Sequence, residues 1–164
     1  MTHLPYECVW VLSVGVGATA FMDVWLMFLR GRGVAVMNFA FLGRWVGHLC
    51  RGVVVHPSIA RAAPVWGEHA LGWATHYVTG IAFAGLLAVL MGTEWIESPT
   101  LLPALAVGIV TVVAPLLIVQ PAMGAGIAGR NTPNPSLNVV KSIANHAVFG
   151  LGLYSVAMLM TVVS

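Results

Sequence analysis

The chain has 164 residues and a net charge of +2, and 59% of its residues are hydrophobic while only 7% are charged. Because an ordinary soluble domain is about 25% charged, this composition, with a mean hydropathy of +0.93, excludes a water-soluble globule. The small net charge, without a basic stripe interleaved with aromatic residues, also argues against nucleic-acid binding.

Four apolar segments are each close to the length of about 20 residues that a helix needs to cross a bilayer core. We predict one all-α membrane domain over residues 1–164, with transmembrane helices at 8–29, 71–91, 101–119 and 143–163. Helices are favoured over barrel strands, which show only about ten residues of alternating pattern. No Lys or Arg precedes the first segment, so we expect a membrane span there and not a cleaved signal peptide.

The first connection, of about 40 residues, is too long to be a plain connector. Residues 39–49 within it are mostly apolar and are interrupted by basic residues. Two interpretations remain open for them. One is a surface-lying or partly re-entrant helix with Arg44 and Arg51 at the lipid headgroups. The other is a soluble loop packed on the helix bundle.

The basic residues are concentrated in two stretches of the chain. All seven Lys and Arg residues lie after the first or third apolar segment: Arg30, Arg32, Arg44, Arg51, Arg61, Arg130 and Lys141. The connection between the second and third segments carries Glu94 and Glu97 instead. Because short basic loops stay in the cytoplasm, we expect the basic stretches inside and both chain termini outside.

Three ionisable residues, Asp23, His76 and His146, fall inside the predicted spans. Ionisable groups are costly in hydrocarbon and usually face the interior of a bundle. At a rise of 1.5 Å per residue, all three lie within roughly 5–10 Å of the cytoplasmic edge. Spacings of four residues add Thr19 and Tyr154 to the same helix faces. We predict a polar intramembrane site from these five residues, with a polar packing seam as the alternative.

The third span contains Pro115, which tends to kink a helix, and a glycine-rich run follows it. We predict a loop there that closes the cytoplasmic mouth of the bundle, with a turn-rich connector as the alternative. The predicted mouth residues are Arg44, His48, Gln120, Met123, Gly124 and Asn134. The glycines match G-x-G-x-x-G, but no strand precedes them, so dinucleotide binding is not expected.

Metal binding is not predicted, because the histidines form no H-x-x-x-H pair and Cys50 has no C-x-x-C partner. Haem ligation by His76 and His146 across facing helices is geometrically allowed, so the cofactor stays undetermined. The predicted topology places Cys8 and Cys50 on opposite sides of the membrane, which excludes a disulfide between them.

Short pieces spread over nearly the whole chain resemble a bacterial family of small integral membrane proteins catalogued as a domain of unknown function. These pieces are residues 22–25, Leu42-Gly43-Arg44-Trp45-Val46-Gly47-His48, Gly67-Glu68, Gly72-Trp73, His76-Tyr77, Gln120-Pro121-Ala122-Met123-Gly124, Thr132-Pro133-Asn134-Pro135 and residues 146–152. The resemblance implies a four-span protein of the bacterial inner (plasma) membrane. It implies no particular activity.

Three functions are compatible with these features. The first is a channel-like or carrier subunit whose polar site titrates, since an unperturbed histidine changes charge near pH 6.5. The second is a non-catalytic factor that assembles or stabilises a membrane complex. The third is an intramembrane enzyme for lipid-like substrates, using Asp23, His76 and Arg44, although the sequence leans away from an enzyme. Because four helices leave little room for a pore, we expect a homo-oligomer or a membrane partner.

Overall fold

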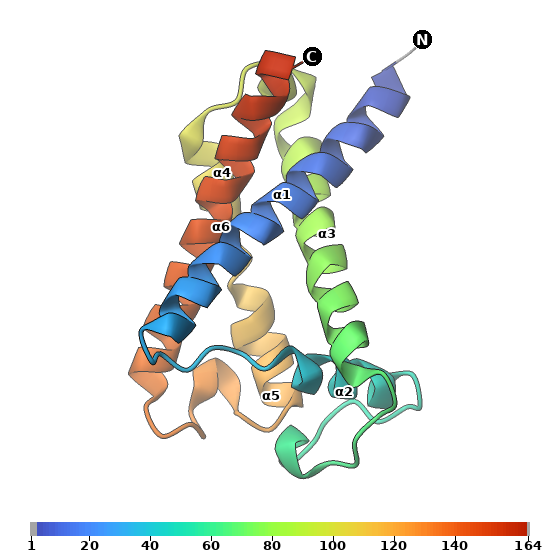
Figure 1. The fold of residues 1–164 in the computed structure, drawn as a ribbon, viewed down its shortest axis with the longest axis vertical. Helices are drawn as coiled ribbons and strands as arrows, with labels where there is room; N and C mark the ends of the chain where they lie inside the picture. Colours follow the sequence, from blue (N-terminus) through green and yellow to red (C-terminus); the bar gives the residue numbers. More distant parts are fainter. Residues whose placement is uncertain (1–2, 164) are drawn as a thin grey trace. The chain divides into compact units, whose positions relative to one another are not determined.

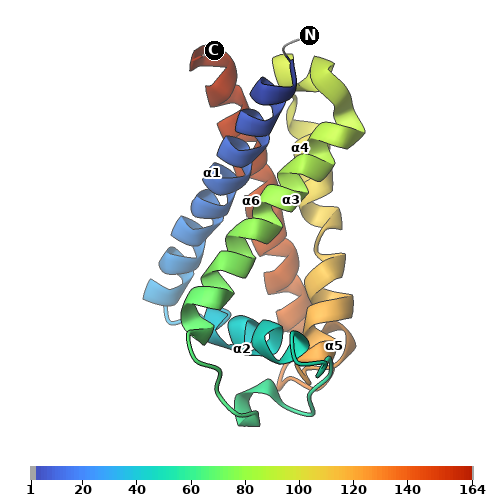
Figure 2. The same cartoon turned by 90° about the vertical axis from the view of Figure 1, so that its right-hand side faces the viewer.

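The computed structural model describes residues 3–163, and side chains from residue 6 to residue 162. Within that range the chain is helical and contains no strand. Figures 1 and 2 show the helices α1 (His3–Gly31), α2 (Phe39–Leu49), α3 (Glu68–Glu97), α4 (Leu101–Val110), α5 (Gln120–Ala122) and α6 (Pro135–Val163). Short helical turns η1 (Ile59–Arg61), η2 (Pro115–Val119) and η3 (Ile127–Gly129) lie between them.

Four stretches of the described chain are long and apolar enough to cross a membrane. They are Tyr6–Gly31, Glu68–Glu97, Leu101–Ala122 and Pro135–Val162. The predicted all-α, four-span architecture is therefore confirmed. The last helix begins earlier than predicted, because Pro135 takes its first position and the Asn134 side chain accepts a hydrogen bond of 3.0 Å from the N–H of Leu137. Both residue types favour a helix start at these places.

The third span is not one continuous α-helix. α4 ends at Val110, and the π-helical turn η2 starts at Pro115 and leads into α5. Proline has no backbone N–H and therefore cannot make the α-helical bond to the carbonyl of Thr111. The chain after the break forms a single π-helical turn, the short form in which π-helices mostly occur.

The first long connection contains a helix, α2, with the bounds that the sequence pattern predicts. Asn38 caps it, since its side-chain oxygen accepts a hydrogen bond of 3.0 Å from the N–H of Ala40. α2 buries Phe39, Leu42 and Gly43. The connection is therefore partly helical, and α2 packs one face against other parts of the protein.

The chain divides into two compact units. Unit 1 comprises residues 1–35, 77–111 and 145–164, and unit 2 comprises residues 36–76 and 112–144. The core of unit 1 includes Trp10, Leu87 and Leu153, which are fully buried. The ring of Trp10 meets the ring of Trp95 edge to face, with centroids 6.0 Å apart.

Small residues set the distances between the helices of unit 1. A Cβ atom added at Gly15 on α1 would press on the backbone of Ile81 on α3. Another at Gly108 on α4 would press on Gly150 of α6. Close approach through small residues is the usual way in which membrane helices associate.

The start of α1 and the end of α6 lie at the same end of unit 1. Figures 1 and 2 show the start of α1, the end of α6 and the connection between α3 and α4 together there. Glu94 and Glu97 belong to this end, whereas Arg30 and Arg32 lie at the other end of α1. Unit 1 thus has an acidic end and a basic end.

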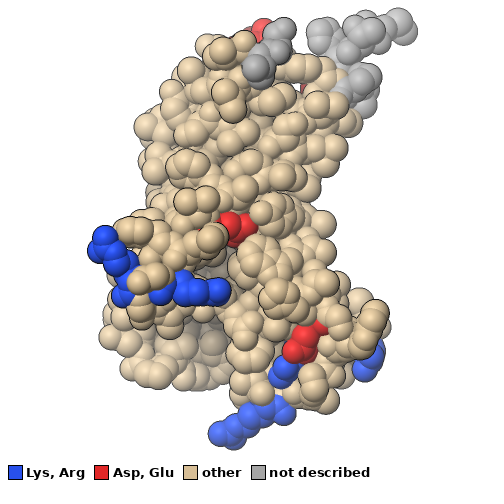
Figure 3. All heavy atoms as spheres, in the orientation of Figure 1, with Lys and Arg blue, Asp and Glu red and all other residues tan. Residues whose placement is uncertain are grey.

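The surface of the spans is apolar. Large hydrophobic side chains are strongly exposed on all four of them, among them Met27, Val89, Leu102 and Val162. In Figure 3 most of the visible surface belongs to residues that are neither acidic nor basic. Such a surface is suited to contact with hydrocarbon.

Candidate functional site

Asp23 and Tyr77 form a polar pair within the membrane-spanning part of unit 1. Asp23 lies on α1 and Tyr77 on α3, and both side chains are half-buried. The phenol of Tyr77 donates a hydrogen bond of 2.8 Å to Oδ2 of Asp23. A hydrogen bond to an ionised carboxylate is about twice as strong as a neutral one. The pair therefore holds an acid at a fixed position within the membrane-spanning part of α1.

A second hydrogen bond shows which parts of α1 and α6 lie side by side within unit 1. The indole N–H of Trp25 donates to Oδ1 of Asn145 at 3.0 Å. Asp23 lies just before Trp25, and His146 lies just after Asn145, on helices that run in opposite directions. Measured from the hydrogen bond between Trp25 and Asn145, Asp23 and His146 therefore lie toward the same end of unit 1. The two residues share one level along the helices.

The contacts of His146 assign its tautomer. Its Nδ1 lies 3.1 Å from the carbonyl oxygen of Gly108 and 3.1 Å from Oγ1 of Thr111. A carbonyl oxygen only accepts, so Nδ1 must carry the hydrogen. The hydroxyl of Thr111 also donates to the carbonyl of Gly108, at 2.7 Å. In the neutral ring of His146, Nε2 is then the nitrogen that carries no hydrogen.

The other predicted members of the intramembrane site have structural contacts. Thr19 is fully buried, donates to the carbonyl of Gly15 at 2.7 Å, and closely approaches Gly80. Tyr154 packs against the hydrophobic core of unit 1. His76 belongs to unit 2, where its ring packs on Phe39 with centroids 4.5 Å apart.

In unit 2, Arg44 and Glu68 form a bidentate ion pair. Nε and Nη2 of Arg44 donate to the two carboxylate oxygens of Glu68, at 2.8 and 2.7 Å. The hydrogen bonds to Glu68 raise the pKa of Arg44 above its ordinary value. Nη1 of Arg44 also donates to the carbonyl oxygens of Ile59, Ala60 and Ala62. One guanidinium therefore ties α2 to the start of α3 and to the loop between them.

Two histidines meet beside this ion pair. Nδ1 of His48 lies 2.7 Å from Nε2 of His56, and the rings are stacked with centroids 4.9 Å apart. His56 is only 6% exposed, and its Nδ1 is buried without a hydrogen-bond partner among the described residues. A buried polar atom left without a partner costs about 1–3 kcal/mol. This nitrogen is thus a buried polar position that an external group could satisfy.

The glycine-rich run after α5 supports the segment that carries His56. The N–H of His56 donates to the carbonyl of Ala122 at 2.8 Å, and the N–H of Ile59 donates to that of Met123 at 3.0 Å. Gly124 has a φ of +93° and lies directly against the carbonyl of Pro57, where a Cβ atom would not fit. Glycine alone adopts this backbone without strain. The glycine-rich run therefore packs against the segment that carries His56 and holds it in place within unit 2.

Gln120 and Asn134 stabilise the chain around α6. Asn138 donates to the side-chain oxygen of Gln120 at 2.9 Å, and Gln120 lies 3.5 Å from the hydroxyl of Ser142. Asn134 is the cap of α6. These contacts are structural.

Unit 2 contains all six residues predicted for the mouth. Arg44 belongs to the ion pair, and His48 belongs to the histidine pair. Met123 and Gly124 belong to the glycine-rich run that contacts the segment carrying His56. Glu68, His56 and Tyr77 join these sites without being among the residues predicted for them. A single acid within a basic stretch was the available signal for Glu68, because such an acid is the natural partner of an arginine.

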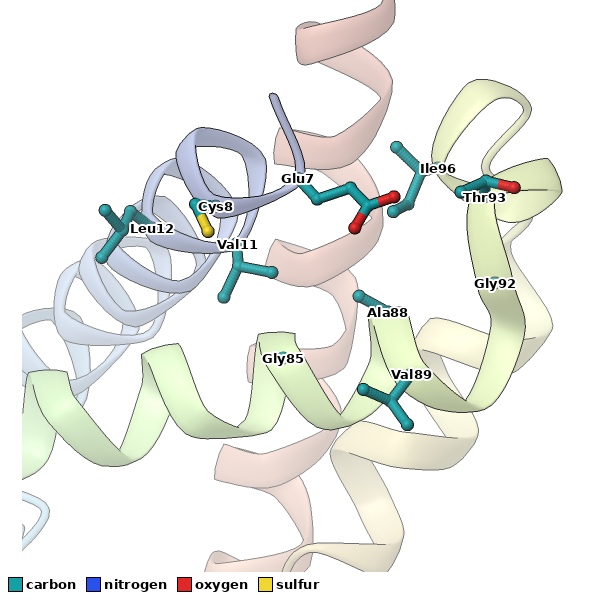
Figure 4. A pocket seen from close by; sticks show the side chains of 10 residues that line it. All are labelled: Glu7, Cys8, Val11, Leu12, Gly85, Ala88, Val89, Gly92, Thr93 and Ile96. Carbon is teal, nitrogen blue, oxygen red and sulfur yellow. The ribbon is translucent and has the colours of Figure 1, made fainter. Parts of the chain in front are cut away.

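Unit 1 also has an apolar groove between α1 and α3, with a cavity volume of about 590 Å³. Figure 4 shows Glu7 reaching from α1 toward Ala88 and Ile96. The wall on α3 consists largely of small residues, and Gly92 interrupts the helix with a φ of +71°. None of the predicted site residues lines this groove.

The described residues contain no group of three or more His, Cys, Asp or Glu side chains that could hold a metal ion. The two cysteines, Cys8 and Cys50, are both exposed thiols.

Four long apolar helices with an exposed apolar surface define a multi-pass membrane protein. The family described as "Protein of unknown function (DUF2938)" has a model that matches residues 12–160, and the chain belongs to this family. The resemblance noted from the sequence is thereby confirmed. No curated protein and no solved structure matches the chain.

Proposed function

We propose that this protein is a proton-coupled carrier or channel-like subunit of the bacterial inner membrane, and that Asp23 takes up and releases the proton. The observation that carries the proposal is the hydrogen bond from Tyr77 to Asp23 inside an apolar span. Ionisable residues in spans commonly mark ion pathways and proton relays. The proposed working form is a homo-oligomer or a complex with a membrane partner, because four helices alone leave little room for a pore.

The geometry around Asp23 supports a titrating role. As an anion, the carboxylate accepts the O–H of Tyr77, and as a neutral acid it has a proton to pass on. His146 lies at the same level of unit 1, and its basic nitrogen is Nε2. Unit 1 thus supplies an acid and a base at one depth, which is the minimum for moving a proton between two protein groups.

The test is proton uptake by sealed vesicles that contain the purified protein and a trapped pH-sensitive dye. With an imposed potential, we expect uptake that Asp23→Asn abolishes. We expect Tyr77→Phe to slow it about tenfold, since the charge-assisted hydrogen bond is lost. Glu94→Gln, which removes an acid near the end of α3, is the matched control and should leave uptake unchanged.

Two outcomes contradict the proposal. Uptake by Asp23→Asn equal to that of the native protein would remove the aspartate from the mechanism. No uptake above that of protein-free vesicles, together with loss of a co-purifying complex in Asp23→Asn, would favour an assembly factor instead.

A further inference from the structure

Unit 2 contains an open pocket that the proposed proton function does not use. It has a cavity volume of about 330 Å³ and is lined by His56, Pro57, Ser58, Arg61 and Ala62. Three of these side chains can donate hydrogen bonds: an imidazole, a hydroxyl and a guanidinium. A ligand group that accepts several hydrogen bonds would satisfy all three.

The imidazole of His56 is the least satisfied polar group of the pocket. Its Nε2 is engaged with Nδ1 of His48, while its own Nδ1 is buried without a partner among the described residues. When Nδ1–H of His48 donates to Nε2 of His56, a neutral His56 carries its proton on Nδ1. That N–H then lacks an acceptor, and an acceptor is what an oxyanion provides.

The charge of unit 2 favours an anion. Its sequence holds five Lys and Arg residues and a single acid, Glu68. That acid is already occupied by Arg44. Arg61 is exposed and forms no ion pair within the described part of the chain. Its planar guanidinium is suited to two parallel hydrogen bonds to a phosphate group.

The pocket wall is held in place before any ligand arrives. Arg44 donates to the carbonyl of Ala62 at 3.1 Å. On the other side, the N–H of His56 is bound to the carbonyl of Ala122 at 2.8 Å. A site held by its surroundings loses less conformational entropy when it binds.

We propose that this pocket binds a phosphate-type oxyanion through Arg61, the hydroxyl of Ser58 and Nδ1–H of His56. The same chemistry is offered by the headgroup of an anionic phospholipid and by a soluble phosphate. The inference does not depend on the proton function, because no residue of unit 1 takes part in it.

The experiment is calorimetric titration of the full chain in a phosphate-free detergent. One arm uses inorganic phosphate, and the other uses a short-chain phosphatidic acid. Saturable binding in both arms identifies a site for soluble phosphate, and binding in the lipid arm alone identifies a headgroup site. We expect Arg61→Gln and Ser58→Ala to weaken binding about tenfold or more, with thermal midpoints that stay at the native value.

Arg51→Gln is the matched control, because Arg51 is an exposed arginine of the same basic stretch and does not line the pocket. Absence of binding in both arms overturns the proposal, as does an equal loss in Arg51→Gln and Arg61→Gln. Nitrogen NMR of labelled histidines gives a second readout. Phosphate should shift the Nδ1 resonance that disappears in His56→Gln, and an unmoved resonance removes His56 from the site.

Discussion

Arg44 is the residue on which the loop of unit 2 depends most. It joins Glu68 by two hydrogen bonds and holds three loop carbonyls with the rest of its guanidinium. Lysine carries one ammonium group and cannot reproduce this planar fork. The contact is therefore specific to arginine, although both residues carry the same charge.

We predict that Arg44→Lys lowers the free energy of unfolding by about 2 kcal/mol, because hydrogen bonds to a charged partner are lost. Hydrogen exchange should also become faster for the amides of residues 56–65. Arg51→Lys changes an exposed arginine without these contacts and should leave both measurements unchanged. Equal exchange in the Arg44→Lys and native proteins would show that the loop does not need the guanidinium.

Among the elements, α2 and α3 make the closest crossing within unit 2. A Cβ atom at Gly72 of α3 would fall against the carbonyl of Phe39, and one at Gly43 of α2 against the carbonyl of Glu68. The two backbones thus touch with no side chain between them. The crossing also positions Arg44, which follows Gly43 directly, beside Glu68.

We predict that Gly72→Ala destabilises the protein by about 1–3 kcal/mol, the usual cost of overpacking. Gly85→Ala on the same helix is the control, since its Cβ would meet only Val11 at an ordinary contact of 3.6 Å. Helix propensity alone favours alanine at both sites by about 1 kcal/mol. Thermal denaturation in detergent should separate the two variants, and equal midpoints would argue against the close crossing.

The helices follow from the sequence more completely than the site does. Apolar length alone predicts the four spans, whereas the pattern of residues 39–49 left a surface helix and a packed loop both open, and the structure has the helix α2 there. The early start of α6 was missed, because the polar turn that Asn134 caps does not look like part of a span. Tyr77 and His56 were not identified as site residues, since their roles depend on side chains far away in sequence. Long-range hydrogen bonds leave no local pattern.

For the whole molecule, the separation of charge makes a prediction about orientation. The basic stretches follow the first and third spans, and Glu94 and Glu97 lie near the end of α3, next to its connection to α4. The positive-inside rule then places Cys50 in the cytoplasm and Ser98 outside. Both positions are exposed in the structure.

We predict that a membrane-impermeant maleimide labels Ser98→Cys on intact cells, in a chain whose Cys8 and Cys50 are replaced by serine. A chain with Cys50 as its single cysteine should be labelled only after the membrane is permeabilised. A chain without cysteine controls for background. Labelling of Cys50 on intact cells would invert the proposed topology and move the oxyanion pocket to the outer side.

The titration of Asp23 inside the membrane is the central claim, and infrared difference spectroscopy tests it most directly. The chain has only five Asp and Glu residues, so the spectrum of Asp23→Asn subtracted from that of the native protein isolates one carboxyl group. We predict that a change of pH produces a carboxylic-acid band in the native protein, that this band is absent in Asp23→Asn, and that it is shifted in Tyr77→Phe, which lacks the hydrogen bond to that carboxyl. Identical pH-difference spectra for the native protein and Asp23→Asn would contradict the account.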